Sequence, residues 1–272
     1  MRDMRFKLLI AALAALALLP SCKSQYDAVL YGSDIQAKYK MAFELFEAKK
    51  YSKAAETFES LTMATKGTAQ DDTVQFYWGL SNYRYGDYIT AESNLQEFIN
   101  TFPLSPFTEE AKFLHLDCLY RGTYRYELDQ MPTYKALSEM SVFQIENPGS
   151  QYHDRVAEMI DDLNNRLEMK AYKSAWLYYH MEDYLAAHYA LKNVLKENAD
   201  NRYREEILYY TAMSAYKYAF NSIPSKQRER YLVFVDDYFN LVSEYPESKH
   251  LKELEGLYNK VQKLLKKDNQ DG

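Results

Sequence analysis

The chain contains few residues that interrupt helices. Only 8 glycines and 7 prolines occur in 272 residues, whereas tyrosine is abundant, with 27 copies. Apolar residues recur with the 3.6-residue period of a helix over long stretches. Scarce helix breakers and this period together predict an all-α protein.

Cysteine and excess basic charge are also lacking. The two cysteines are Cys22 and Cys118, and if Cys22 is lipidated no disulfide is expected. Cys118 lies in the apolar helical pattern of residues 113–120, which predicts a buried, unreactive thiol. The formal net charge is −6, and removal of residues 1–21 would make the remainder more acidic. This balance argues against general nucleic-acid binding, which needs a basic surface.

The first residues have the layout of an export signal. Arg2, Arg5 and Lys7 precede the apolar run Leu8–Leu19. That run is too short to span a membrane as a helix, which needs about 20 residues. No later apolar stretch approaches this length.

The motif Leu19-Pro20-Ser21-Cys22 follows and resembles the lipobox of bacterial lipoproteins. The resemblance implies that residues 1–21 are a signal peptide and that Cys22 carries covalent lipid, palmitate included. Pro20 departs from the commonest motif, which has a small residue there. The alternative is an ordinary secretory signal followed by an unrelated cysteine.

Residues 79–91, Gly-Leu-Ser-Asn-Tyr-Arg-Tyr-Gly-Asp-Tyr-Ile-Thr-Ala, resemble the signature of the tetratricopeptide repeat (TPR). Gly79 and Ala91 are expected to face one another, so that two antiparallel helices approach closely. Gly86 permits the tight turn between them. Tyr88 and Leu95 fill the space between the helices.

The same frame recurs along the chain and predicts a right-handed solenoid of about five helix pairs with a C-terminal capping helix. Repeats three and five carry extra residues, expected in their internal turns at 127–132 and 221–227. Repeat four is expected to begin with one long helix over 153–181. The predicted segments are a lipidated linker at 22–33, repeats at 34–66, 71–103, 108–148, 153–199 and 204–246, a cap at 248–267 that ends the 34–267 solenoid, and a tail at 268–272.

Related short sequences mark the ends of several repeats. Phe102-Pro103-Leu104-Ser105-Pro106-Phe107 is echoed by the sequences at 147–152 and 245–248. Ser105 followed by Pro106 predicts a helix start, with serine as the cap and proline at the first helical position.

Taken together, these features resemble the BamD family, the TPR lipoproteins of the outer-membrane β-barrel assembly machine (the BAM complex). The resemblance rests on the lipobox, the five repeats, the enlarged turns and the long fourth-repeat helix. It also rests on the sequences at 102–111 and 184–187 and on Tyr-Arg-Glu-Glu-Ile-Leu-Tyr at 203–209. The third repeat departs from it in lacking the usual Gly-x-Tyr turn, and Ala199 replaces a proline.

The resemblance implies a non-enzymatic scaffold, anchored by lipid to the periplasmic face of the outer membrane. Its expected partners are a BamA-like barrel assembly protein, other subunits of the machine and unfolded outer-membrane protein clients. One alternative is another lipid-anchored TPR adaptor that serves envelope or cell-wall machinery. A third possibility, a glycan-binding lipoprotein of the starch-uptake type, is disfavoured because that family is much longer.

Catalytic and metal-binding patterns are lacking. The chain has no G-x-S-x-G, P-loop, Rossmann or H-E-x-x-H motif, so no enzyme, no metal and no cofactor beyond the lipid is predicted. His115, Asp117 and Cys118 point to different sides of one helix and are expected to be structural or solvent-facing. The acidic pairs at 71–72, 161–162 and 236–237 are expected to be caps or solvated helix faces.

Aromatic residues recur at positions on the first helix of each repeat that line the concave face in TPR proteins. We expect them to form a groove for an extended, aromatic-bearing peptide. The alternative, equally open at this point, is that they fill the space between repeats. The candidates are Tyr39, Phe43, Phe46, Phe76, Tyr83, Phe113, Tyr120, Tyr172, Trp176 and Tyr179.

Overall fold

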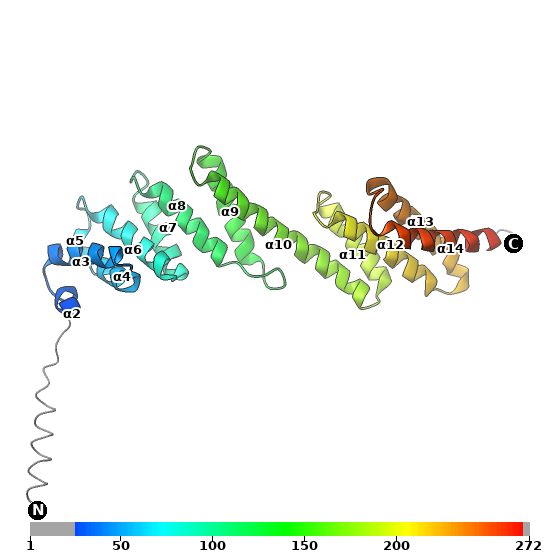
Figure 1. Cartoon of the computed structure of the whole chain (residues 1–272), viewed down its shortest axis with the longest axis horizontal. Coiled ribbons are helices and arrows are strands. Elements are labelled where there is room, and N and C mark those ends of the chain that lie inside the picture. Colours follow the sequence, from blue (N-terminus) through cyan, green and yellow to red (C-terminus); the bar gives the residue numbers. More distant parts are fainter. Residues whose placement is uncertain (1–24, 269–272) are drawn as a thin grey trace, which may run out of the picture. The chain divides into compact units, whose positions relative to one another are not determined.

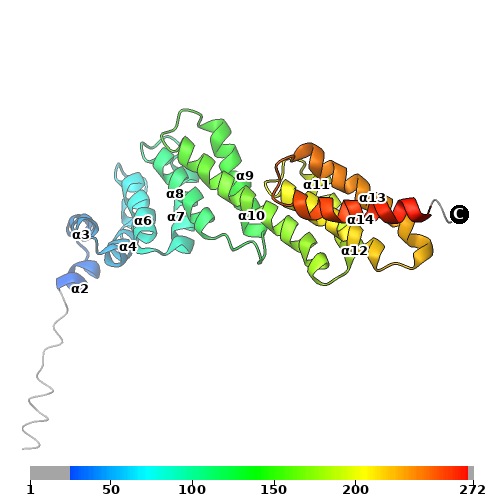
Figure 2. The ribbon, with the colours of Figure 1, turned by 45° about the vertical axis from the view of Figure 1, so that its right-hand side comes forward.

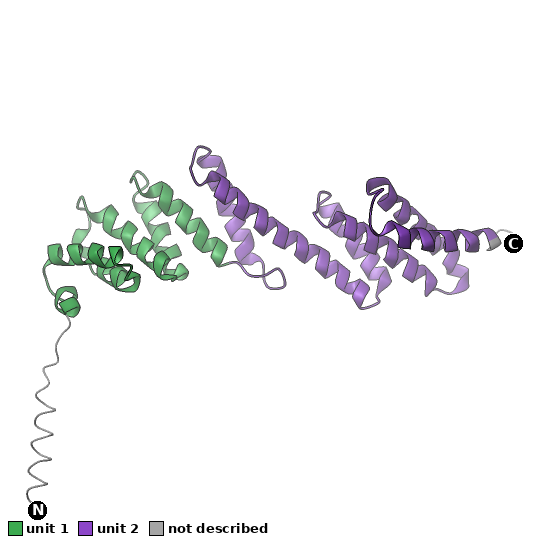
Figure 3. Ribbon diagram, in the orientation of Figure 1, with its two compact units in different colours: residues 1–122 green, residues 123–272 purple. Residues whose placement is uncertain are grey.

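The structure is a computed structural model that describes residues 25–268 (Figure 1). Within this range every regular element is a helix, and successive helices form pairs, so the all-α prediction is confirmed. The chain divides into two compact units at Gly122 and Thr123 (Figure 3). This boundary falls inside the predicted third repeat.

Unit 1 consists of consecutively packed helices. Helix α3 packs on α4, α4 on α6, α6 on α7, and α7 on α8. The short α2 lies inside the stretch expected to be a linker at 22–33. The helix bounds are α2 (Gln25–Leu30), α3 (Ile35–Glu47), α4 (Tyr51–Glu59), α5 (Thr62–Thr65), α6 (Asp71–Tyr85), α7 (Tyr88–Thr101) and α8 (Thr108–Arg121).

Unit 2 follows the same principle with longer helices. Its α10 is one uninterrupted 28-residue helix, as the sequence predicts. Helices α12, α13 and α14 lie side by side in both Figure 1 and Figure 2. The bounds are α9 (Met131–Glu146), α10 (His153–His180), α11 (Tyr184–Glu197), α12 (Arg204–Phe220), α13 (Pro224–Glu244) and α14 (Leu251–Asp268).

The turn inside the second helix pair has the geometry that its glycine allows. Gly86 closes α6 in the left-handed region, at φ 94°. Asp87 then caps α7, and its side chain accepts a hydrogen bond from the Thr90 backbone N–H at 3.1 Å. A side chain with a Cβ would be strained at Gly86, so this position fixes where the chain reverses.

Gly79, inside α6, lies opposite a different residue from the one expected. An added Cβ on Gly79 would lie 3.0 Å from a methyl carbon of Leu95, and its nearest neighbours are Leu95 and Asn94. Gly79 therefore accommodates Leu95, one helical turn beyond the Ala91 that the sequence analysis places opposite it. Ala91 is completely buried all the same.

The five turns that precede α6, α8, α10, α12 and α14 share one hydrogen-bond pattern. In each, a side-chain oxygen accepts from the backbone N–H two residues later, at 2.9–3.3 Å. The carbonyl of the same residue accepts from the N–H three residues later, where the helix begins. The residues are Thr68, Ser105, Ser150, Asn201 and Ser248. The helix after Ser105 thus begins at Thr108 and not at Pro106, because the serine hydroxyl closes a turn first.

The enlarged turns occur in only one of the two predicted places. Residues 122–130 form a long connection between α8 and α9. In repeat five the turn is short, because Ile223 is extended and Pro224 opens α13 directly. The extra residues of that repeat lengthen α13 and leave its turn short.

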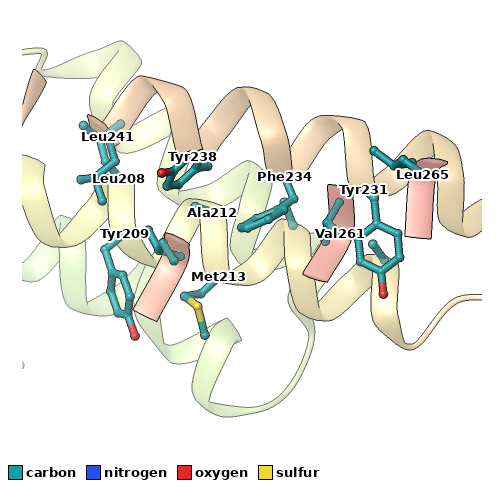
Figure 4. Packing of buried hydrophobic residues seen from close by; sticks show 13 residues of the cluster. Leu208, Tyr209, Ala212, Met213, Tyr231, Phe234, Tyr238, Leu241, Val261 and Leu265 are labelled. Carbon is teal, nitrogen blue, oxygen red and sulfur yellow. The ribbon is translucent and has the colours of Figure 1, made fainter. Parts of the chain in front are cut away.

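Each unit has its own apolar core. In unit 1, Phe58 and Phe98 are completely buried, and burial of one such side chain contributes about 1.5–3 kcal/mol. In unit 2 the largest cluster joins α12, α13 and α14. Figure 4 shows Tyr231 and Phe234 of α13 beside Val261 of α14 in this cluster.

Candidate peptide-binding surface

The aromatic residues of α3 lie half-buried along the packed face of that helix. The ring of Phe43 is 5.1 Å from Phe58 and 4.8 Å from Tyr77, measured between centroids. Phe46 lies 5.1 Å from Tyr77, and Tyr39 lies 5.0 Å from Phe43. The rings of Phe43 and Phe46 are held edge to face by residues of the next helices, and Tyr39 packs on Phe43; part of each ring remains accessible.

The two candidates on α6 differ in burial. Phe76 is only 2% exposed and stacks on Phe107 with 4.6 Å between ring centroids. Tyr83 is half-buried, and its hydroxyl donates to Asp117 Oδ2 at 2.7 Å. Phe76 is thus a core residue, whereas Tyr83 sits where the core meets solvent.

Tyr83 belongs to a polar cluster between α6 and α8. Asp117 is buried and also pairs with Arg121. The guanidinium of Arg121 lies 4.8 Å from the centre of the Tyr88 ring. Burial, followed by the hydrogen bond to Asp117, raises the pKa of Tyr83 to about 12. The hydroxyl therefore stays protonated at neutral pH and acts as a fixed donor.

The neighbouring residues on α8 are all inside the protein. His115, Asp117 and Cys118 are each at most 4% exposed, so the solvent-facing option is wrong for all three. Burial, reinforced by the charge of Asp117, raises the pKa of the Cys118 thiol to about 12. The thiol is therefore protonated and inert in the folded state, as predicted. The other two candidates on this helix, Phe113 and Tyr120, are half-buried.

Three candidates lie on α10 in unit 2. Tyr172 is 5% exposed and stacks on Tyr203, with 5.4 Å between centroids. Trp176 is half-buried and stacks on His180 at 5.3 Å. Tyr179 is half-buried and lies 5.0 Å from Tyr210, and burial raises the pKa of Tyr179 to about 12.

Eight of the ten candidates thus keep part of the ring accessible, while Phe76 and Tyr172 are packed inside. Three lie on α3 and two on each of α6 and α8 in unit 1, and three lie on α10 in unit 2. The groove itself remains a prediction for the half-buried eight. The two buried rings offer no face to a ligand.

A second polar cluster, which the sequence did not suggest, lies in unit 2. Asp237 is 3% exposed, and its Oδ2 is 2.7 Å from His188 Nε2. Lys192 Nζ donates to the other carboxylate oxygen at 3.0 Å. The buried side chain of Asp237 therefore links α13 to α11 through polar contacts, whereas its neighbour Asp236 is exposed. Sequence spacing could not reveal this, because His188 and Asp237 are 49 residues apart.

The other acidic pairs are also engaged in tertiary contacts. Asp71 is buried and accepts from the Gly67 backbone N–H at 2.7 Å, and Asp72 accepts from Ser105 Oγ at 2.8 Å. Asp161 of α10 pairs with Arg202 in the turn before α12. The expectation of simple caps and solvated faces is therefore wrong for Asp71 and Asp72, whereas Asp161 is exposed on a solvated helix face as expected.

A shallow hollow of about 280 Å³ opens beside the Asp237 cluster. It is lined from α11, α12 and α13, and the guanidinium of Arg230 lies 4.0 Å from the centre of the Tyr218 ring at its edge. Leu185, Tyr189 and Val233 bring exposed apolar surface to it. The hollow thus combines apolar surface with one basic and one acidic residue, Arg230 and Glu229.

Within residues 25–268, no group of three or more histidine, cysteine or acidic side chains is placed to hold a metal ion. In the same range, no helix combines the length and the apolar character needed to cross a bilayer. Cys22, the predicted lipidation site, and residues 1–21 lie outside the described residues.

Known proteins resemble this chain in sequence and in structure. The family model for YfiO, described as an outer membrane lipoprotein, matches residues 33–217. None of the curated proteins compared with the chain matches it. A similar solved structure is the crystal structure of a thermophilic TPR protein of Thermus thermophilus. It has 15% sequence identity and a TM-score of 0.30, and the match covers 84% of this chain and 99% of that one. Because the family match extends over about two thirds of the residues, from α3 into α12, the chain belongs to the BamD (YfiO) family of outer-membrane lipoproteins.

Proposed function

We propose that this protein is a non-enzymatic scaffold for the assembly and insertion of β-barrel proteins into the outer membrane. In this proposal, lipid on Cys22 holds it at the periplasmic face as a subunit of a BAM-type complex. The observation that carries the proposal is the family match over residues 33–217. Consecutive helix pairs with aromatic rings at their edges support a binding role over a catalytic one.

Unit 1 is proposed to bind client peptides. Strands of outer-membrane barrels alternate apolar and polar residues and carry aromatic girdles, so an unassembled strand exposes a row of rings. Half-buried rings such as Tyr39, Phe43 and Tyr83 are held by their neighbours and still have accessible surface. Each aromatic pair with a client contributes about 0.5–1.5 kcal/mol beyond area burial, which suits reversible capture.

Unit 2 is proposed to bind a BamA-like partner and other subunits of the machine. Its hollow between α11 and α13 combines exposed apolar side chains with the opposite charges of Arg230 and Glu229. The buried tie through Asp237 fixes these two helices relative to one another. A rigid, partly apolar recess of this kind is typical of protein interfaces.

The test of client binding uses a labelled peptide with the sequence of a C-terminal barrel strand. Tyr39→Ser and Tyr120→Ser should each weaken binding several-fold, and Phe43→Ala and Tyr83→Ala should do so where the helical signal is retained. Tyr85→Ser is the matched control, because Tyr85 is 61% exposed on α6 and outside the row. If every folded variant binds as tightly as the parent, these rings are core residues and the groove does not exist.

The anchor and the partner are tested separately. Cys22→Ala should move the protein from the membrane fraction to the soluble periplasm and remove the acyl mass from the N-terminal peptide. A pull-down through a C-terminal tag, with Tyr189→Glu as the interface variant, should recover a barrel assembly protein with the parent only. Recovery of cell-wall enzymes in its place would favour the alternative of another lipid-anchored adaptor.

A further inference from the structure

One end of unit 2 brings together two segments that are distant in sequence. The turn between α12 and α13 lies at the same end as the last turns of α14 (Figure 1). Arg228 Nη1 donates to the Leu265 carbonyl at 3.2 Å and ties the two segments together. Tyr231 and Leu265 belong to the same core cluster directly beneath (Figure 4). We refer to residues 217–232 and 260–266 as the distal end.

The distal end is basic in an acidic protein. It contains seven basic residues and one acidic residue, whereas the whole chain has a net charge of −6. The acidic residue, Glu229, is already paired with Lys226 at 3.4 Å. Lys260, Lys263 and Lys266 follow one another at three-residue spacing on the side of α14 away from its core, and all are exposed.

The same end exposes large apolar side chains. Phe220 and Ile223, on either side of the turn, are 59% and 66% exposed. Leu232 and Leu264 are each 48% exposed. Apolar side chains at the tip of a helical hairpin with lysines around them have the composition of an interfacial membrane-binding surface. The lysine stems can lie along the apolar boundary while the ammonium groups reach phosphate.

We propose that the distal end binds the surface of a bilayer that contains anionic phospholipid. Phe220 and Ile223 enter the boundary between head groups and acyl chains, and the lysines of α14 lie at the phosphates. Two observations favour a lipid surface over an acidic protein. The chain belongs to a family of outer-membrane lipoproteins, so a bilayer is its permanent neighbour. The uncovered apolar residues are at the tip of a turn, where they can enter a bilayer without rearrangement of the helices.

The proposal is independent of peptide binding, and most of the distal end lies beyond residue 217, where the family match ends. It would give the chain a second membrane contact in addition to the predicted lipid.

The test is cosedimentation of the mature chain with vesicles, with Cys22→Ser so that no acyl chain contributes. The chain should bind vesicles of phosphatidylcholine mixed with phosphatidylglycerol, not bind phosphatidylcholine alone, and bind less tightly as salt increases. The triple variant Lys260→Gln, Lys263→Gln, Lys266→Gln should bind on the order of 100-fold more weakly at low salt. A matched triple variant in unit 1, with Lys40, Lys50 and Lys66 changed to Gln, should bind like the parent.

A second pair of variants separates a lipid surface from charge alone. Phe220→Ser with Ile223→Ser should weaken binding about tenfold. Ile223→Trp, in a chain with Trp78 and Trp176 changed to Phe, should show a blue shift of its fluorescence on anionic vesicles. Absence of binding to anionic vesicles at low salt overturns the proposal. Equal loss in the unit 1 control also overturns it. A third contrary result is binding to poly-glutamate that is as tight as binding to vesicles and is unaffected by the Phe220 and Ile223 substitutions. That result would indicate that the distal end binds an acidic protein surface.

Discussion

The two units use different aromatic residues for the same kind of helix packing. The core of unit 1 is built around phenylalanine, with Phe58 and Phe98 completely buried. The core of unit 2 adds tyrosine to the completely buried Phe234, and Tyr209, Tyr231 and Tyr238 are all under 10% exposed. The hydroxyl group of a buried tyrosine needs a hydrogen-bond partner, so part of the stability of unit 2 depends on hydrogen bonds.

Unit 2 also carries several ion pairs between segments that are distant in sequence. Arg202 pairs with Asp161, Arg204 with Glu244, and Lys249 with Glu206. The Tyr209 hydroxyl donates to Glu253 at 2.9 Å and ties α12 to α14. Charged contacts respond to pH and salt, whereas apolar burial responds little to either. The comparison predicts that unit 2 is the pH-sensitive half of the molecule.

Each unit can be followed by its own tryptophan, because the chain has two, Trp78 in α6 and Trp176 in α10. Single-tryptophan variants, made by changing the other one to Phe, report the unfolding of unit 1 and of unit 2 separately. All the predictions below use urea unfolding followed by this fluorescence.

The largest effect is expected from loss of a phenylalanine in unit 1. Phe58→Ala removes a completely buried ring that contacts Phe43 and Tyr77, and should cost about 3–5 kcal/mol. The Trp78 midpoint should fall strongly while the Trp176 midpoint stays in place. Tyr85→Ala, at an exposed site in the same unit, is the control. A parallel fall of both midpoints would show that the units unfold as one.

Next in size is the loss of the buried carboxylate in unit 2. Asp237→Ala leaves His188 and Lys192 without their common acceptor and should lower the free energy of unfolding by about 1.5–3 kcal/mol at the Trp176 reporter. The matched control is Asp236→Ala, one residue earlier and exposed. Equal effects of the two substitutions would contradict the structural role assigned to Asp237.

Overpacking in unit 1 should cost somewhat less. Ala91 is completely buried between α6 and α7, so Ala91→Phe should destabilise unit 1 by about 1–3 kcal/mol, measured at Trp78. Ile89→Phe, at a residue that is 85% exposed on the same helix, should change little. An unchanged urea midpoint in Ala91→Phe would mean that the core of unit 1 has enough space around residue 91 for a phenylalanine ring.

The smallest effect concerns acid. Burial is the main cause that lowers the pKa of His250 below its ordinary value of 6.5, and its ring stacks on Tyr209 at 3.9 Å. In the unfolded chain His250 takes up a proton near pH 6.5, while the folded chain does so only at lower pH. The unfolded state then binds more protons, so the stability of unit 2 should fall as pH drops below about 6.5. In His250→Gln, the urea midpoint at Trp176 should depend less steeply on pH than in the parent. An unchanged pH dependence in that variant would exclude His250 as its source.

Much of the local architecture could be predicted from the sequence, because it depends on neighbours in the chain. Gly86 marks a left-handed turn residue, and it acts through its own backbone angles. The long helix α10 follows from an uninterrupted apolar period. The recurring serine, threonine or asparagine before each pair reflects a hydrogen bond that spans only two residues.

What could not be predicted depends on how helices cross. Tyr83 and Phe76 occupy similar positions on one helix, yet only Phe76 is sealed, by stacking on Phe107 from the next segment. Asp237 and Asp236 are indistinguishable in sequence, and only the approach of α11 makes one of them a buried acceptor. The contact of Gly79 with Leu95, and not with Ala91, likewise follows from a shift of one turn between two helices.

The buried thiol of Cys118 can be used to measure how often the helices around it separate. A group that is 2% exposed and protonated up to about pH 12 reacts with a thiol reagent only when α8 separates from its neighbours. The modification rate at neutral pH therefore reports how often unit 1 opens in the native state, without an introduced reporter residue. In an intact membrane preparation this rate would show whether the proposed binding of a client peptide stabilises or destabilises the helices of unit 1.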